Sequence, residues 1–380
     1  MMEALPVINE PKLTSYLFSK ASKAKMPLNG TFELSPVCNF SCHMCYVRKT
    51  AKEVAAHDRP MMTLDQWIDI AKEAQKAGML YLLLTGGEPF LWPDFWKLYE
   101  QLSQMGLLIS INTNGSLIDD AVVERLKKMP PTRINITLYG ASDAAYHRLC
   151  GADHVFSQVD RAITKLKAAG ITVKLNGSLT PDNISDFEAC CKYGTDHGVI
   201  YEPNTYMYPP VRRDAAMVGK NERFTPKEAA FYKLNAYQKQ YGDEAYKKFL
   251  NAIIHHYVEP PGLDDRCIDS KDGRILCRAG SASFWVTWDG WLTPCGMMPE
   301  PKVEMQGRSF TEAWHDLVCE SEKLKLSGVC RDCPDRKLCH SCAAMAMAET
   351  GDASGIPTYL CEMVRNMKEI ASETLEKWND

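Results

Sequence analysis

A buried strand that ends in a tight turn is predicted by the run Leu80-Tyr81-Leu82-Leu83-Leu84-Thr85-Gly86-Gly87-Glu88-Pro89. Five consecutive apolar residues are typical of a parallel strand that is covered on both faces. The two glycines let the main chain approach a ligand closely, and the Glu88 carboxylate can accept hydrogen bonds from an ammonium group. Taken alone, the same turn also fits a plain connection between a strand and a helix.

Outward from this run, short apolar segments alternate with amphipathic ones, which is typical of repeated βα units. A capping box at Thr63 begins one intervening helix, and Pro93 lies in the first turn of the next. Six units are fewer than the eight of a closed barrel, so we expect an α/β fold, an open partial (β/α)6 barrel with its site at the carboxyl ends of the strands. The predicted strands are 31–35, 80–84, 107–111, 133–139, 171–179 and 199–208.

Three cysteines follow the first predicted strand in the spacing C-x3-C-x2-C, at Cys38, Cys42 and Cys45. Three thiolates on a cubane iron–sulfur cluster leave one iron open to a small molecule. The alternative is a zinc site, but structural zinc takes four ligands, and His43 is too close to Cys42 and Cys45 to complete such a set comfortably. The spacing therefore favours an iron–sulfur cluster.

This motif resembles that of the radical S-adenosylmethionine (radical SAM) superfamily. In that family the open iron chelates SAM, and an electron from the [4Fe–4S] cluster cleaves the sulfonium to methionine and a 5′-deoxyadenosyl radical that abstracts hydrogen from a substrate. The cofactor carries the difficult chemistry, and the protein orients it. The resemblance also implies an electron donor such as flavodoxin or ferredoxin.

The resemblance implies a set of SAM-binding residues on the loops that follow the predicted strands. The Gly-Gly-Glu-Pro turn of the family holds the SAM amino group, and Thr137 keeps a hydroxyl that contacts SAM. The implied contacts are Met44, Gly86, Gly87, Glu88, Pro89, Asn112 and Thr137. Three positions depart from the family pattern: Met44 replaces an aromatic residue, Tyr139 an aspartate, and Cys150 an arginine.

The cysteines after residue 262 resemble the SPASM extension of radical SAM enzymes, which binds two auxiliary [4Fe–4S] clusters. Carried over by position, the implied ligands of the first cluster are Cys267, Cys277, Cys295 and Cys342, and those of the second are Cys330, Cys333, Cys339 and Cys361. Full ligation favours electron transfer over substrate binding. If Cys267 is not a ligand, the first cluster is instead open to substrate.

A zinc ribbon is the alternative for the closely spaced thiols Cys330, Cys333, Cys339 and Cys342. It leaves four other cysteines of the pattern unexplained. The remaining cysteines are expected to be small buried hydrophobic residues: Cys150, Cys190, Cys191 and Cys319.

Composition restricts the setting in which this chain works. Its 380 residues are 45% hydrophobic and carry a formal net charge of −4. This charge gives no positive electrostatic field that would attract nucleic acid. Neither a signal peptide nor a membrane-spanning run is present, and a cytoplasmic location is expected. We expect an N-terminal segment (1–30), a barrel (31–210), a helical bridge (211–262), a SPASM domain (263–365) and a C-terminal helix (366–380).

The resemblance leaves three hypotheses about function. The first is a maturase that oxidises or crosslinks a ribosomally made peptide. The second is an oxidoreductase or epimerase that acts on a small metabolite. The short segment before the barrel favours this second hypothesis. The third is a non-catalytic iron–sulfur or zinc protein, which the turns at Gly86 and Asn112 disfavour.

Sulfatase maturases carry an aspartate base after the cysteine matching Cys295, whereas Gly296 stands here. No catalytic acid or base is identified; the candidates near strand ends are Tyr139, Tyr206, Tyr208 and Arg212.

Overall fold

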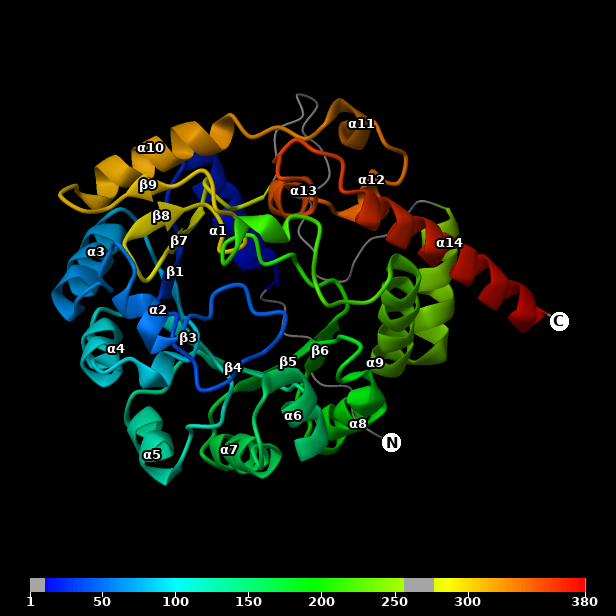
Figure 1. Cartoon of the computed structure of the whole chain (residues 1–380), viewed down its shortest axis with the longest axis horizontal. Coiled ribbons are helices and arrows are strands. Elements are labelled where there is room, and N and C mark those ends of the chain that lie inside the picture. The colour runs from blue at the N-terminus through cyan, green and yellow to red at the C-terminus, as the bar shows by residue number, and fades with distance from the viewer. Residues whose placement is uncertain (1–10, 256–276, 380) are drawn as a thin grey trace.

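The structure, a computed structural model, describes residues 11–255 and 277–379. Its centre is one curved sheet of nine strands in the order β6-β5-β4-β3-β2-β1-β7-β8-β9. The pairs from β1 to β6 are all parallel, so the six predicted βα units form a partial barrel (Figure 1). The strands are β1 (Asn29–Glu33), β2 (Tyr81–Thr85), β3 (Leu108–Thr113), β4 (Arg133–Thr137), β5 (Val173–Ser178), β6 (Tyr201–Asn204), β7 (Ser283–Val286), β8 (Trp291–Thr293) and β9 (Val303–Glu304).

Helices cover the outside of the barrel sheet (Figure 1). Those of the N-terminal half are α1 (Pro11–Ala24), α2 (Ala51–Ala55), α3 (Leu64–Lys76), α4 (Phe95–Gln104), α5 (Asp120–Lys128), α6 (Asp143–Cys150), α7 (Phe156–Ala168) and α8 (Phe187–Asp196). The remaining helices are α9 (Pro226–Ile254), α10 (Phe310–Glu322), α11 (Gly328–Arg331), α12 (Arg336–Cys339), α13 (Ala343–Thr350) and α14 (Thr358–Asn379). Short 3-10 turns lie at η1 (Pro89–Leu91), η2 (Ile184–Asp186) and η3 (Ala215–Met217).

The main core lies between the sheet and these helices. Leu82 and Leu84 of β2 are fully buried, and the Phe32 ring of β1 packs on the Trp67 indole of α3 at 4.8 Å between centroids. The predicted capping box is present at Thr63, whose hydroxyl accepts the Gln66 N–H. Because a side-chain cap satisfies a main-chain donor that the helix cannot, the boundary of α3 was readable from sequence.

The C-terminal part extends the barrel sheet instead of forming a separate sheet. Strand β7 pairs in parallel with β1, with Asn29 opposite Ser283 and Phe32 opposite Val286. Strands β8 and β9 then follow in antiparallel order. Strand β1, which precedes the cysteine loop, is therefore paired with a strand on each side.

Two long helices, α9 and α14, pack side by side at the edge of the barrel (Figure 1). Their shared core contains Leu234, Leu250, Met363 and Met367. Within α9 the helix is interrupted at Gly242, whose φ of 79° favours glycine. The expected bridge (211–262) contains η3 and α9, and its last residues, 256–262, lie outside the described residues.

Two expectations about the C-terminal half were wrong. Helix α14 begins at Thr358, not at 366, so Cys361 lies in its first turn. Cys319 is exposed, because the buried face of α10 is formed by Phe310, Trp314 and Leu317. Cys150 and Cys190 are buried as expected, and Cys191 is half-buried.

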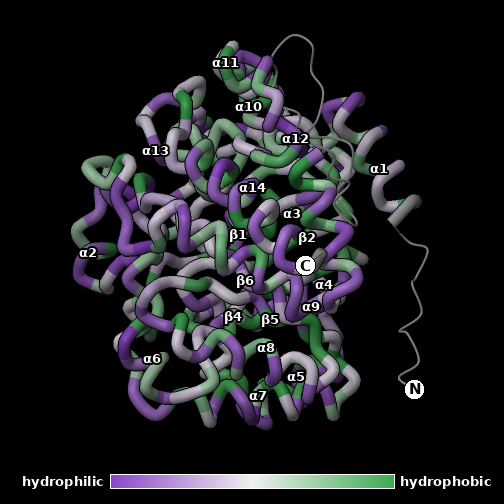
Figure 2. Tube along the Cα trace, turned by 90° about the vertical axis from the view of Figure 1, so that its right-hand side faces the viewer, coloured by the Kyte–Doolittle hydropathy of each residue, from purple (hydrophilic) through white to green (hydrophobic). Residues whose placement is uncertain are grey.

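The two ends of the barrel carry different elements. Figure 2 shows α1 at one end and α2, which follows the cysteine loop, at the opposite end.

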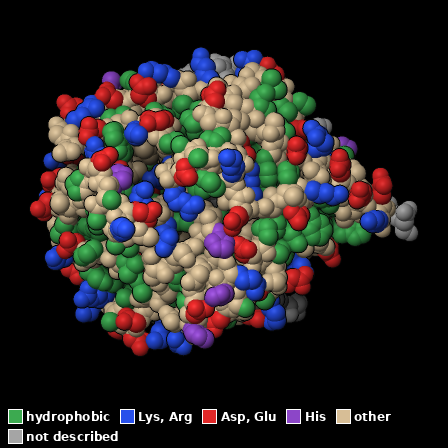
Figure 3. Space-filling view, viewed as in Figure 1, with side chains coloured by type: hydrophobic (Ala, Val, Ile, Leu, Met, Phe, Trp, Pro, Cys, Tyr) green, Lys and Arg blue, Asp and Glu red, His purple; other side chains and the backbone are tan. Residues whose placement is uncertain are grey.

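Figure 3 shows acidic and basic side chains mixed over one face. Within residues 11–255 and 277–379, no helix is long and apolar enough to cross a bilayer.

Candidate active site

A cavity of about 370 Å³ opens at the carboxyl ends of the barrel strands. Strand-end residues on its wall include Thr85, Thr113 and Thr137. The three loop cysteines all line it, and so do five of the implied SAM contacts, Met44, Gly86, Gly87, Asn112 and Thr137. The sequence motifs thus meet in one cavity, as expected for parallel strands whose loops converge at this end.

The thiols of the cysteine loop are free and surrounded by hydrogen-bond donors. The Phe40 N–H donates to Cys38 Sγ at 3.4 Å, and the Arg48 N–H donates to Cys45 Sγ at 3.3 Å. Burial raises the pKa of Cys38 to about 12 and also raises that of Cys45. Inward-facing thiols with main-chain donors fit a cluster, whose iron replaces the thiol protons.

Cys42 differs from the other two loop cysteines in the direction of its pKa shift. Hydrogen bonding to the Cys150 thiol lowers the pKa of Cys42 despite its burial, and a hydrogen bond from the Tyr139 hydroxyl lowers it further. The Tyr139 ring lines the cavity, whereas Cys150 is fully buried behind the loop at the end of α6. Two residues that depart from the family pattern therefore meet at one thiol.

The glycine turn after β2 packs main chain against main chain. The Gly87 N–H donates to Ser35 O at 2.7 Å, and the Glu88 N–H donates to Val37 O at 2.9 Å. A Cβ at Gly86 or Gly87 would collide with the carbonyl oxygens of Ser35 and Val37. Glycine is therefore needed here to bring the turn against the start of the cysteine loop.

Glu88 and Pro89 are buried and lie outside the cavity wall, whereas the other five implied SAM contacts line it. The Glu88 carboxylate accepts hydrogen bonds from the Thr113 hydroxyl at 2.9 Å and from the Asn114 N–H at 2.8 Å. Burial nevertheless raises its pKa to about 7. Glu88 thus joins the turn after β2 to the turn after β3 from behind the wall.

Asn114 is a site residue that the sequence-based set omitted. Its side-chain amide donates to Asn39 Oδ1 at 2.9 Å and contacts Cys38 Sγ at 3.7 Å. Its place in the Asn-Thr-Asn-Gly turn was the available signal. The set named Asn112, which also lines the cavity and accepts a hydrogen bond from Asn135 at 2.8 Å.

Of the acid–base candidates, Tyr139, Tyr206 and Tyr208 line the cavity, whereas Arg212 does not. The Tyr206 hydroxyl donates to Glu349 at 2.7 Å, and that carboxylate is also paired with Arg223. Burial raises the pKa values of all three tyrosines, so their hydroxyls stay protonated. Arg212 is held in an ion pair with Glu33 and is not available to a ligand in the cavity.

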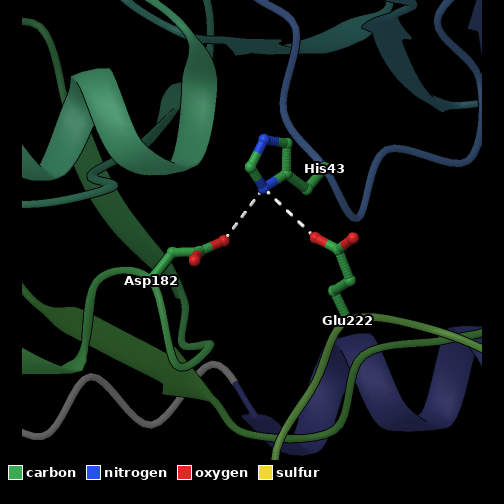
Figure 4. A group of neighbouring side chains, drawn as sticks. All are labelled: His43, Asp182 and Glu222. Atoms are coloured by element: carbon green, nitrogen blue, oxygen red, sulfur yellow. Dashed lines mark hydrogen bonds and ion pairs between the residues drawn. The ribbon is translucent and has the colours of Figure 1, made fainter.

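His43, between the second and third loop cysteines, ties that loop to two other segments. Its Nδ1 lies 3.0 Å from Asp182 Oδ2 and 3.3 Å from Glu222 Oε2 (Figure 4). His43 and Glu222 are exposed, and Asp182 is half-buried. His43 is not among the residues that line the cavity with the thiols, and its ring contacts the chain after β5 and the chain before α9. This arrangement fits a clamp on the loop.

The C-terminal cysteines fall into two groups. The pKa of Cys295 is raised to about 12 by burial and further by the neighbouring Cys342 and Cys277 thiols. Burial also raises the pKa of Cys330, with contributions from its neighbours Cys361, Cys339 and Cys333. The division matches the two implied ligand sets as far as they are described; Cys267 lies outside the described residues.

The first group lies directly behind the cavity wall. Tyr208 lines the cavity, hydrogen-bonds to Cys342 and packs with Cys295 in one apolar cluster. Met297, two residues after Cys295, also lines the cavity. One layer of side chains therefore separates the cavity from this thiol group.

Comparisons with known proteins agree with this geometry. Residues 32–193 match the model of the Radical SAM superfamily. The chain is 22% identical over 333 residues to an AdoMet-dependent heme synthase of Methanosarcina barkeri, covering 84% of this chain and 92% of the relative. It is 30% identical over 173 residues to the mycofactocin maturase MftC of Mycobacterium ulcerans, covering 44% of this chain and 45% of that one.

Among solved structures, native anSMEcpe with bound AdoMet and Cp18Cys peptide has a similar fold, with a TM-score of 0.66 and 19% identity. The match covers 92% of this chain and 98% of that one. At this identity the likeness concerns the fold, which extends through the C-terminal part. With a superfamily domain over residues 32–193 and three cysteines in the cavity at its strand ends, this protein is a radical SAM enzyme, which uses SAM and a [4Fe–4S] cluster.

Proposed function

We propose that Cys38, Cys42 and Cys45 hold the SAM-binding [4Fe–4S] cluster and that the cavity wall binds SAM. Such a cluster would supply the electron needed to break the sulfonium bond of SAM. Met44, Gly86, Gly87, Asn112 and Thr137 would contact SAM, since they line the same cavity as the thiols. Glu88 and Pro89 would act indirectly by fixing the turn that carries the two glycines.

We further propose that the C-terminal region is a SPASM domain with two auxiliary [4Fe–4S] clusters. The observation that carries this proposal is the division of the thiols into two groups, one of them behind the cavity wall at Tyr208. An oxidation that begins with hydrogen abstraction must dispose of a second electron. A cluster one side-chain layer from the substrate would accept it.

The substrate that the site supports best is a ribosomally made peptide, which the enzyme would oxidise or crosslink. The maturase MftC is a sequence relative over 173 residues, and the fold is shared with a protein that was solved with AdoMet and a peptide. The expected electron donor is a flavodoxin or ferredoxin, and the expected location is the cytoplasm.

Sulfatase maturation is disfavoured by packing as well as by sequence. A Cβ at Gly296 would lie 2.7 Å from three atoms of the Trp285 indole. The indole is fixed because its N–H donates to Glu33 at 2.9 Å. The space that an aspartate base after Cys295 would need is therefore occupied by a ring that cannot easily move.

A small metabolite is the second candidate substrate, and the extent of one sequence match favours it. The heme synthase match covers 84% of this chain, whereas the MftC match covers 44%. The deciding assay incubates the reconstituted enzyme, SAM and dithionite with short peptides encoded beside its gene, and separately with porphyrin precursors of haem. A mass change in a peptide supports the maturase. Turnover of a porphyrin, with every peptide unchanged, supports the alternative.

A further inference from the structure

The cavity at the strand ends has a second wall that the proposed SAM contacts do not form. Those contacts come from the loop after β1 and from the ends of β2, β3 and β4. Another part of the lining comes from the chain after β6 and the chain after β8. Tyr206, Met207, Tyr208 and Met297 form this second wall.

The second wall is assembled where the two ends of the curved sheet approach each other. Strand β6 ends the order of strands on one side and β8 lies near its other end, yet Tyr208 and Met297 pack against the same small apolar cluster around Met298 (Figure 1). The rings of Tyr206 and Tyr208 pack edge-on at 4.9 Å between centroids. The side chains of the second wall therefore support one another from both ends of the sheet.

Main-chain hydrogen bonds hold the β6 side of the second wall in place. The Met207 carbonyl oxygen accepts a hydrogen bond from the Arg223 guanidinium at 3.1 Å. The Tyr208 carbonyl oxygen accepts one from the Asn221 amide at 2.8 Å. A ligand would thus meet a wall that is already formed, as is usual for small-molecule sites.

The charged groups nearest to the second wall are paired with one another. Arg223 binds the Glu349 carboxylate at 2.6 and 2.9 Å, and these side chains are 7% and 6% exposed. Glu349 also accepts the Tyr206 hydroxyl at 2.7 Å, and Arg212 is paired with Glu33. Because these charges already have partners, a charged ligand group at the second wall would lose its water without gaining a new ion pair.

We infer that the second wall binds one uncharged, largely apolar side chain of the substrate peptide, and that Met207, Tyr208 and Met297 determine this specificity. The described residues that line the cavity carry apolar, aromatic, thiol, hydroxyl or amide side chains, or are glycines. Methionine side chains adapt to apolar and aromatic groups, and tyrosine rings pack on both. The inference rests on the proposed function, because it assigns the opposite wall to SAM.

The size of the cavity agrees with a single side chain. Its volume of about 370 Å³ lies near the lower end of the roughly 300–1,000 Å³ of ligand cavities. Since the thiols and the proposed SAM contacts line the same cavity, a cluster and SAM would take up much of that volume. A porphyrin would need more space and partners for several carboxylates. The second wall thus favours a peptide, which would insert one residue.

The test is saturation-transfer NMR on the full-length, anaerobically reconstituted protein with SAM and without reductant. The probes are the N-acetyl amides of leucine, tyrosine, glutamate and lysine, each titrated separately. We expect the leucine and tyrosine probes to bind at least about tenfold more tightly than the two charged probes, because small apolar contacts in a hydrophobic pocket are already worth about tenfold.

Met297→Lys places a cation in the second wall. It should weaken binding of the leucine probe and strengthen binding of the glutamate probe, each by about tenfold. Met297→Leu keeps an apolar side chain and should preserve the wild-type order of the probes. Leu13→Lys is the matched control, because it adds the same charge at an exposed position on α1, at the other end of the barrel from α2 (Figure 2). It should leave the binding of every probe unchanged.

Wild-type protein that binds a charged probe as tightly as the leucine probe, or that binds none of the probes, would overturn the inference. An unchanged order of probes in Met297→Lys, at wild-type iron content, would also overturn it. The wild-type comparison requires no variant, so it decides the question even where Met297→Lys does not fold. Because this measurement requires neither SAM cleavage nor turnover, failure of the proposed function would appear separately, as absent 5′-deoxyadenosine or as peptides of unchanged mass.

Discussion

Glu33 and Arg212 form a buried bidentate ion pair, in which both guanidinium nitrogens lie 2.9 Å from the two carboxylate oxygens. Their side chains are 1% and 12% exposed. Glu33 ends β1, and Arg212 also donates to the Gly296 carbonyl in the C-terminal part. The pair therefore fastens the chain that carries Cys295 to the strand that precedes the cysteine loop.

Replacing Arg212 with Met should destabilise the protein strongly, because it leaves the Glu33 charge buried and unpaired. We expect a loss of about 3–5 kcal/mol in the free energy of unfolding. Urea titration of the cluster-free protein measures it. Arg213→Met is the matched control at an exposed neighbouring position, where a change within about 0.5 kcal/mol is expected. Equal effects of the two substitutions would contradict the assignment of Arg212 to the buried pair.

Gly296 should not tolerate a side chain. Gly296→Ala places a methyl group against the Trp285 indole, which Glu33 holds in place, and should cost about 1–3 kcal/mol in the free energy of unfolding. Gly328→Ala is the control, since a Cβ there has no atom within 4 Å. Differential scanning calorimetry compares the two. A melting temperature unchanged by Gly296→Ala would show that Trp285 does not fill this space.

Glu88 should make stability depend on pH. Its folded pKa of about 7 lies above its ordinary value of 4.5, so its contribution is complete below pH 4.5 and is lost as pH rises through 7. Relative to Glu88→Gln, the wild type should lose about 2.5 kcal/mol of unfolding free energy between pH 5 and pH 8. Urea unfolding of the cluster-free protein at several pH values measures this difference.

Glu100→Gln, at an exposed carboxylate on α4, is the control for this pH series. Its difference from the wild type should stay constant between pH 5 and pH 8. A difference between wild type and Glu88→Gln that is also constant over that interval would contradict a buried, destabilised Glu88 carboxylate.

Iron content should report the three proposed clusters separately. The reconstituted wild type should bind about twelve irons, four for each cubane. Cys295→Ala should remove about four, whereas Cys190→Ala, at a buried cysteine outside the implied ligand sets, should remove none. Iron and zinc are measured together by mass spectrometry. A wild-type value near four irons would eliminate the auxiliary clusters.

The sequence was most informative where local chemistry determines structure. The apolar run before Gly86 and the cap at Thr63 predicted a strand and a helix that the structure contains, because burial and capping act over a few residues. The meeting of the turn motifs in one cavity followed from parallel topology.

Long-range contacts could not be predicted in this way. The parallel pairing of β7 with β1 joins residues far apart in the sequence, and nothing local marks it. Arg212 was an acid–base candidate by its place near a strand end, but it lies in a buried ion pair with Glu33. Glu88 was an implied SAM contact, and its carboxylate lies behind the cavity wall, bonded to the turn after β3. In each case the partner, and not the residue type, determined the role.

The proposed function requires that thiols of the cysteine loop hold the cluster that cleaves SAM. The most direct measurement is 5′-deoxyadenosine formation from SAM and dithionite by the anaerobically reconstituted protein, quantified by mass spectrometry. The wild type and Cys319→Ala, which alters an exposed cysteine, should form it, and Cys42→Ala should form none. Undiminished formation by Cys42→Ala, or only zinc at these thiols in the wild type, would contradict the assignment of these cysteines as cluster ligands.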